Sequence, residues 1–143
     1  MASVLEDICR SDYSAIRLEE NNANDISKIQ KLSFDLFNET SRAQLIVHLA
    51  LLNSLSDQRC ICFYSERLLA AVGDFHIKYN SMCKNYSRIE LNRIHEDVLL
   101  LLVLSSNHPA FSFHEKYEFK KFYDILCGSF SINTALEVCM YNH

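Results

Sequence analysis

The stretch DQRCICFYSERLLAAVGDFHIKY, residues Asp57–Tyr79, decides the fold class of this chain. Its apolar and aromatic residues recur at intervals of three and four, which places them on one face of a long helix. Asp57 is a candidate N-cap at its start. Gly73 lies in its later part, where it marks either close packing against a neighbouring helix or the end of the helix.

The composition of the whole chain favours helices elsewhere too. The chain has 143 residues, of which 49% are hydrophobic, so it can bury the core of one domain. Two glycines and one proline are too few for the many turns of an all-β protein. We therefore expect an all-α fold, a helical bundle of about five to six helices.

Helical spacing also appears on both sides of the central segment, with candidate caps and stops between the repeats. Gly128 is a candidate C′ residue after the last of these segments. The further predicted helices cover residues 2–10, 24–37, 41–55, 91–104 and 114–127.

Two short runs complete this division of the chain. Val98–Leu104 is the longest apolar run, but it is shorter than the ~20 residues that span a bilayer, and it predicts a fully buried core helix covered by two neighbours. Leu136–Tyr141 has strand character and would have to pair with another strand or remain mobile. We expect a helical domain over residues 1–128 and a short tail over 129–143.

The charge of the chain argues against nucleic acid as its main partner. The net charge is −4, whereas duplex binding draws on clustered Lys and Arg. The nearest approach to a basic cluster is Lys116, Lys120 and Lys121, and it is interrupted by Glu115 and Glu118. This pattern is typical of a solvated helix face.

The six cysteines do not form a recognisable metal or redox motif. Cys60 and Cys62 would point ~200° apart on a helix, and no Cys-x-x-Cys pair occurs. No export signal is apparent, so reduced thiols are expected. Cys60 beside Arg59 is the best local candidate for a nucleophile, but no phosphate loop, dinucleotide fingerprint or metalloprotease motif accompanies it. We expect no catalytic residues, no metal, no cofactor and no enzyme activity.

The aromatic residues of the central helix and of the two predicted helices after it, from Phe63 to Tyr123, indicate surface for partners. They are more numerous than a lone 16.6 kDa domain readily hides, and large exposed aromatic patches usually mark protein interfaces. Periodicity cannot separate a core from an obligate interface, so the alternative that all of them are core stays open.

The central segment resembles the long helix of the Psf-one-type subunit of GINS, a small helical assembly of eukaryotic replication forks. The resemblance covers roughly residues 1–105 and is specific only in residues 57–69. The chain departs from the family in two ways. Arg67 follows Tyr64 by three residues instead of four. The family's C-terminal β domain is missing, unless Leu136–Tyr141 is the stub of its first strand. The matching residues are Arg59, Cys60, Tyr64, Arg67, Leu68 and Leu69, preceded by His48–Leu52, with Val4–Ile8 and Asn24–Phe37 fitting the first two helices.

The resemblance implies a non-catalytic scaffold subunit in the nucleus. It would form a hetero-oligomer with the other Psf-type and Sld-type GINS subunits, and through GINS it would join the MCM motor and the Cdc component in the CMG helicase during DNA replication. No membrane and no direct sequence-specific nucleic-acid contact is implied. The residues predicted to form the partner interface are Arg59, Cys60, Phe63, Tyr64, Arg67, Leu68, Phe75 and Tyr79.

Two other classes remain as alternatives. The first is a viral Bcl-type helical bundle that binds an amphipathic death-motif helix in a groove. Its size and helix count suit the chain, but its Asn-Trp-Gly-Arg signature is absent, since the chain has no Trp. The second is a small cysteine enzyme built around one reactive thiol.

Overall fold

The structure is a computed structural model that describes residues 15, 17–18, 20–21 and 23–141. Its described residues form helices and no strand, so the predicted all-α fold is confirmed. The elements are α2 (Ile26–Ile29), α3 (Glu39–Leu51), α4 (Gln58–Met82), the 3₁₀ turn η1 (Cys83–Asn85), α5 (Arg88–Ser106) and α6 (Phe113–Tyr141).

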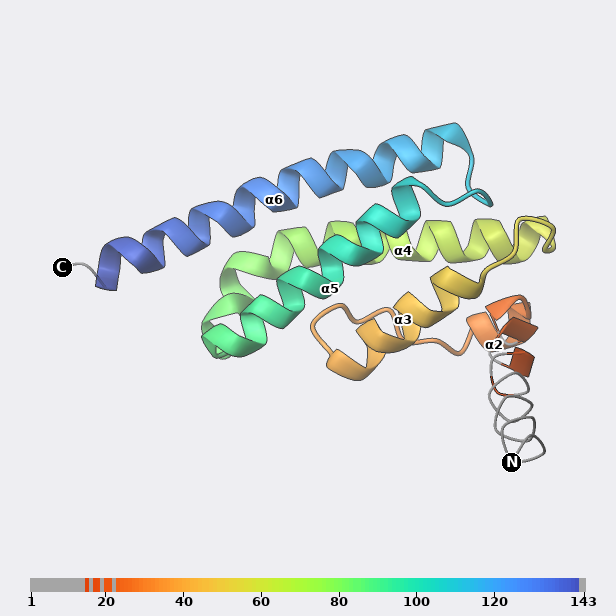
Figure 1. Cartoon of the computed structure of the whole chain (residues 1–143), viewed down its shortest axis with the longest axis horizontal. Coiled ribbons are helices and arrows are strands. Elements are labelled where there is room, and N and C mark those ends of the chain that lie inside the picture. Colours follow the sequence, from red (N-terminus) through yellow and green to blue (C-terminus); the bar gives the residue numbers. More distant parts are fainter. Residues whose placement is uncertain (1–14, 16, 19, 22, 142–143) are drawn as a thin grey trace, which may run out of the picture.

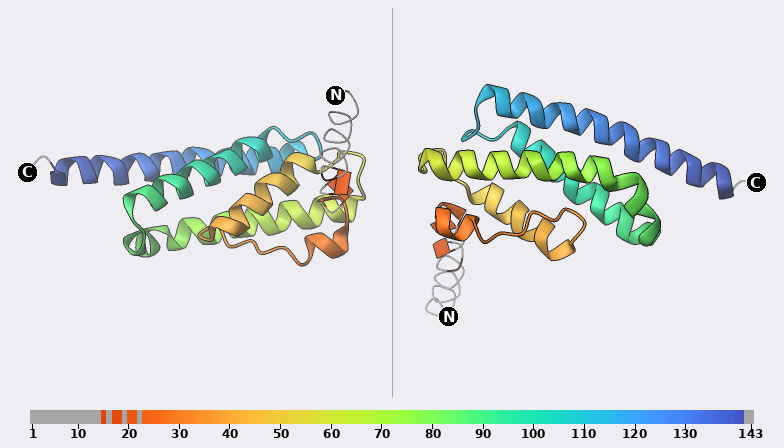
Figure 2. Two further views of the ribbon diagram at one scale, coloured as in Figure 1. Left: turned by 60° about the horizontal axis from the view of Figure 1, so that its bottom comes forward. Right: turned by 180° about the vertical axis from the view of Figure 1, so that it is seen from behind.

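The helices form a bundle in which α5 packs between α3 and α6 (Figure 1). Helix α4 runs behind α5, and it comes to the front when the molecule is seen from the opposite side (Figure 2). It contacts α6 and the short helix α2. Helix α6 extends beyond the other helices at its C-terminal end (Figure 1).

Side-chain caps fix where the helices begin. The side chain of Asn38 accepts a hydrogen bond from the Ser41 N–H at the start of α3, and Asp57 accepts from the Arg59 N–H at the start of α4. Ser87 and Glu90 form a reciprocal capping box at the start of α5. Each cap satisfies backbone donors that the first helical turn leaves unpaired, so the boundary of α4 predicted at Asp57 is confirmed.

The helix predicted over residues 24–37 is wrong beyond its first turn. Asp25 caps α2, but that helix ends at Ile29, and residues 32–38 are irregular. Ser33 and Asp35 accept hydrogen bonds from backbone N–H groups two residues on, a local alternative that competes with the helix. The irregular segment still contributes to the core through Leu36, which is buried.

The prediction of a helix end at Gly128 and of a strand at Leu136–Tyr141 is wrong. Helix α6 continues from Phe113 to Tyr141, so the expected domain boundary at residue 128 falls inside it. Packing supports the extension, because the ring of Phe130 stacks on His95 of α5 with centroids 3.9 Å apart. The helix predicted over residues 2–10 lies outside the described residues.

The core follows the length of α4. The expected apolar stripe of this helix faces inward. Gly73 lies inside α4, which continues to Met82, so the reading of Gly73 as a helix end is wrong. An added Cβ would lie 3.8 Å from Cζ of Phe122 in α6, an ordinary contact distance, so the contact between α4 and α6 at this point does not require glycine. The largest fully buried side chains are Tyr64, Tyr79, Phe75, Phe119, Ile29, Leu45, Leu49, Ile61, Leu68, Ile94, Leu101 and Leu102.

Two buried polar contacts tie α3 to its neighbours. Arg42, with a side chain only 3% exposed, donates from Nε to Asp97 of α5 at 2.9 Å. His108, in the loop after α5, accepts from the Ala110 N–H at Nδ1 and therefore donates from Nε2 to the Leu49 carbonyl at 2.8 Å. Burial lowers the pKa of His108, so the neutral ring makes this contact.

Candidate functional site

Most of the predicted interface on α4 lies inside the molecule. Five of its eight side chains are at most 2% exposed. The hydroxyl of Tyr64 donates a hydrogen bond to the Leu45 carbonyl of α3 at 2.7 Å. These side chains are covered by other helices of the same chain, so in the folded domain they offer no surface to a partner. They belong to the core instead: Cys60, Tyr64, Leu68, Phe75 and Tyr79.

The other three predicted residues are at or near the surface. Arg59 is exposed and donates to Asp57, which lowers the pKa of that carboxyl. Arg67 lies over the rings of Phe63 and Phe34, with its guanidinium carbon 5.7 and 5.5 Å from their centroids. Phe63 is half-buried in this contact. The three residues remain available to a partner, and their role in binding stays a prediction.

The four cysteines whose side chains the structure describes show no arrangement for chemistry. Cys60, Cys62, Cys83 and Cys127 are free thiols, and burial raises the pKa of Cys60, which opposes activation as a thiolate. In the part of the chain that the structure describes, no three His, Cys, Asp or Glu side chains come close enough to hold a metal ion. The same part contains no helix with the length and hydropathy needed to cross a bilayer.

Helix α5 is not fully buried, contrary to the expectation from its apolar run. Its two neighbours cover it as predicted, but Leu100 is 44% exposed and Val103 is 41% exposed. The two residues lie on the side of the helix that points away from the buried Val98, because steps of two and five residues turn a helix by about 200° and 140°. Every Lys, Arg, Asp and Glu of this helix occurs before Val98.

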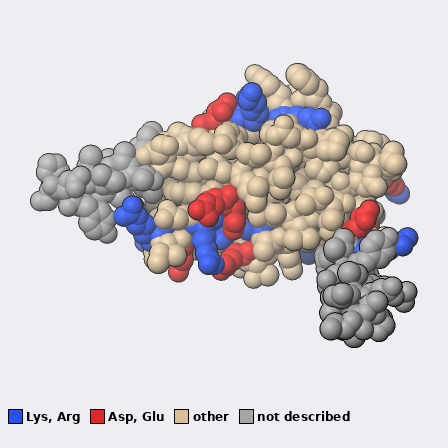
Figure 3. All heavy atoms as spheres, in the orientation of Figure 1, with Lys and Arg blue, Asp and Glu red and all other residues tan. Residues whose placement is uncertain are grey.

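Helix α3 has the same division between a charged and an uncharged half. Its Glu39 and Arg42 lie near the start, and residues 43–51 include no Lys, Arg, Asp or Glu. The two helices run parallel, so their uncharged halves lie side by side and form an uncharged area (Figures 1 and 3). We call this area the α3–α5 apolar face; its exposed and half-buried residues are Ile46, Val47, Ala50, Leu100, Val103 and Leu104.

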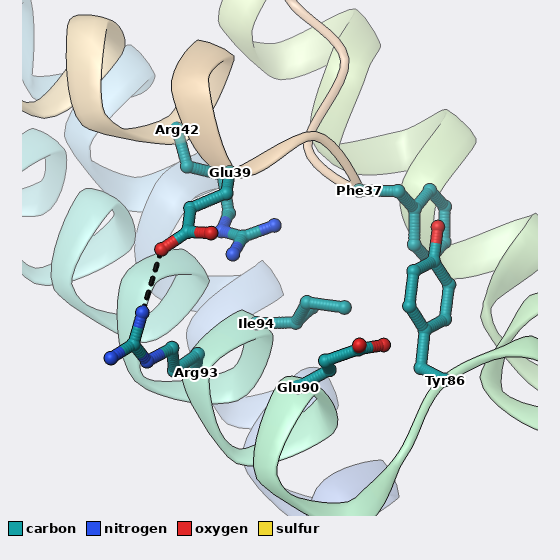
Figure 4. A pocket seen from close by; sticks show the side chains of 7 residues that line it. All are labelled: Phe37, Glu39, Arg42, Tyr86, Glu90, Arg93 and Ile94. Atoms are coloured by element: carbon teal, nitrogen blue, oxygen red, sulfur yellow. Dashed lines mark hydrogen bonds and ion pairs between the residues drawn. The ribbon is translucent and has the colours of Figure 1, made fainter.

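A pocket of about 250 Å³ opens at the charged end of the same two helices (Figure 4). Phe37 and Tyr86 form one wall, with nearly parallel rings 6.0 Å apart. On the opposite side, Arg93 of α5 forms an ion pair with Glu39 of α3 at 2.7 Å. We call this cavity the α3–α5 pocket; its lining residues are Phe37, Glu39, Arg42, Tyr86, Glu90, Arg93 and Ile94.

Basic residues are mixed with acidic ones on the face shown in Figure 3, where the cationic groups lie among acidic groups. Lys121 on α6 contacts Glu118, and Lys78 on α4 contacts Asp74. An electrostatic footprint for a nucleic-acid backbone would need such charges to be clustered and unpaired.

One family model matches residues 16–129 and is described as the SMAUG-like PHAT domain. The match spans the helices from α2 through most of α6, including the α3–α5 apolar face and the α3–α5 pocket. No curated protein and no solved structure matches the chain.

This match corrects the resemblance to GINS. The residues that suggested it, from Asp57 to Leu69, are mostly packing positions of a central helix, and such positions recur in unrelated bundles. The predicted role in DNA replication is therefore wrong. The predicted partners, which were the sister GINS subunits, MCM and the Cdc component, are wrong for the same reason. The Bcl-type alternative gains no support from the match either. Nuclear localisation rested on the same resemblance and stays a prediction.

The family model covers well over half of the chain, and its matched residues contain both surface features described above. The chain belongs to the SMAUG-like PHAT domain family.

Proposed function

We propose that this PHAT domain is a non-catalytic protein-binding module in the regulation of RNA, and that it binds a partner protein through the α3–α5 apolar face. The link to RNA regulation rests on the SMAUG-like family. The choice of a protein partner rests on one observation, the exposure of aliphatic side chains along the uncharged halves of two parallel helices.

Direct contact with RNA fits the domain less well. The net charge is −4, and several surface cations form ion pairs with carboxylates, as Arg93 does with Glu39. A groove that follows a nucleic-acid backbone combines unpaired cations with exposed aromatic platforms. Phe113, whose side chain is 86% exposed, is the first residue of α6 and precedes Glu115 by two positions, so its surroundings include an acidic group.

The apolar face has the character of an interface core. Val47, Leu100 and Val103 are each 41–44% exposed, so their inner parts are held by the bundle while their outer parts remain in water. Full burial of an aliphatic side chain contributes about 1.5–3 kcal/mol, so covering the exposed part of one of these side chains should contribute about 1 kcal/mol to binding. Interface cores are depleted in charge in the same way.

A charge-insertion variant tests this proposal. Leu100→Glu combined with Val103→Glu places two carboxylates in the face without filling the core, and Ile77→Glu on α4, where the side chain is 80% exposed, is the matched control. Each protein is used as bait in RNase-treated extract, with helix content checked by circular dichroism. We expect the double variant to lose RNA-regulatory proteins that the wild type and the control retain.

The result that would overturn the proposal is equally specific. If the double variant folds and captures the same proteins as the wild type, the apolar face is not the binding surface. If capture depends on intact RNA, or if the isolated domain binds RNA in a direct anisotropy titration at moderate salt, the domain acts on RNA itself.

A further inference from the structure

In the part of the chain that the structure describes, the α3–α5 pocket has one lining carboxylate without an ion pair, that of Glu90. The guanidinium of Arg93 contacts Glu39 at 2.7 Å, and the guanidinium of Arg42 contacts Asp97 at 2.9 Å. Both cations of the lining are thus matched by carboxylates. Within the described residues, the Glu90 carboxylate accepts one long hydrogen bond, from the Ser87 N–H at 3.4 Å.

The uncompensated carboxylate faces an aromatic wall. Figure 4 shows Glu90 directed toward Tyr86, with Phe37 beyond it and the buried Ile94 between the two sides. Aromatic rings attract cations, and a planar guanidinium both stacks on such rings and forms two parallel hydrogen bonds with a carboxylate. A negative charge beside aromatic rings therefore selects an arginine over a lysine.

The size of the pocket limits what enters it. Its volume of about 250 Å³ lies below the roughly 300–1,000 Å³ typical of small-molecule sites. A single long side chain suits this space better than a free metabolite. The pocket also adjoins the apolar face along α3 and α5, so a side chain seated in it would belong to a polypeptide that crosses both helices.

We propose that the α3–α5 pocket receives an arginine side chain of a partner polypeptide, held between the Glu90 carboxylate and the ring of Tyr86. The inference deepens the proposed protein-binding function and rests on it for the identity of the binder as a protein. It adds the chemistry of the contact: a basic anchor next to an apolar segment.

An NMR titration tests the pocket without knowledge of the partner. The full chain is titrated with N-acetyl-argininamide, with N-acetyl-lysinamide and with N-acetyl-glutamic acid amide. We expect saturable shifts at the amides of Tyr86, Glu90 and Ile94 with the arginine probe, weaker shifts with lysine and none with the acidic probe. Binding should weaken at roughly 1 M salt, where the Debye length is ~3 Å.

Glu90→Gln is the decisive variant, because glutamine at this position preserves the capping box and hence the start of α5. It should weaken arginine binding about tenfold or more, as expected for loss of a charge-assisted hydrogen bond. Glu96→Gln, at an exposed carboxylate of the same helix outside the pocket, should leave binding unchanged. Equal affinity of wild type and Glu90→Gln, or a preference for the acidic probe, would overturn the inference.

The two proposals fail separately. If the arginine probe does not bind while the apolar-face variant still loses its partners, only the pocket assignment is wrong. If the probe binds and the apolar-face variant keeps its partners, the pocket stands and the proposed docking surface is wrong.

Discussion

Two ion pairs that join the same two helices provide a sharp test of the structure. Arg42–Asp97 and Arg93–Glu39 both connect α3 to α5, with N···O distances of 2.9 and 2.7 Å. Their side chains differ in exposure, 3% and 33% for the first pair against 65% and 68% for the second. Because water screens the second pair more strongly than the first, the interaction energies should differ although the geometry is similar.

The size of the difference follows from the surroundings of Arg42. Asp97→Asn removes the charge that balances the buried Arg42 guanidinium and leaves it two neutral acceptors, the amide oxygen at position 97 and the Leu36 carbonyl at 3.3 Å. Breaking a buried pair costs about 3–5 kcal/mol, and partial exposure of Asp97 should reduce this to about 2–3 kcal/mol. The exposed pair should contribute about 0.2–1 kcal/mol.

Double-mutant cycles measure both interaction energies by urea unfolding at neutral pH. One cycle uses Arg42→Met with Asp97→Asn, and the other uses Arg93→Met with Glu39→Gln. The coupling of the exposed pair should disappear at roughly 1 M salt, while that of the buried pair should persist. If the two couplings are equal, or if salt abolishes both, then Arg42 is not buried in solution as the structure places it.

Three further changes test the packing. Protonation of His108 would break its contact with the Ala110 N–H. Burial lowers the pKa of His108 in the folded protein below 6.5, so as pH falls the unfolded chain binds the proton first. The free energy of unfolding should therefore fall as pH drops from about 6.5 through the folded pKa. His108→Asn should flatten this part of a plot of unfolding free energy against pH, and an unchanged slope would assign it to other groups. Tyr64→Phe removes a buried hydrogen bond and should cost about 1 kcal/mol in urea unfolding, whereas no loss would mean that the bond is absent in solution. Gly73→Ala should raise the melting temperature, since the added methyl group gains up to about 1 kcal/mol of helix propensity and meets Phe122 at ordinary contact distance; a drop would show overpacking.

The start of α4 could be predicted from the sequence because its causes are local. Asp57 supplies the cap within two residues of the N–H it binds, and the apolar repeat continues from there. The end of α6 could not be predicted, because its causes are not local. Gly128 costs about 1 kcal/mol of helix propensity, and contacts such as that of Phe130 with His95 outweigh this cost only once α5 is in place.

The same limit explains the interface prediction. Tyr64 and Leu100 follow the same helical spacing, yet one is fully buried and the other is 44% exposed. Exposure depends on how many helices surround each position, and neither spacing nor residue type records that number. The apolar run of α5 was correctly read as a helix with two neighbours, but two neighbours leave a stripe uncovered when the third side faces water.

The direction in which α3 and α5 pack decides what their sequences mean. Each helix has its charges in its first half and none in its second, a pattern visible in the sequence of each alone. Antiparallel packing would set the charged half of one beside the uncharged half of the other and divide both surfaces. Instead Glu39 meets Arg93, Arg42 meets Asp97 and, one step further along, Leu49 meets His108, so like halves coincide. Parallel packing is thus what produces a charged pocket next to an apolar face, and it is the reason that one polypeptide with a basic anchor and an apolar segment would match both.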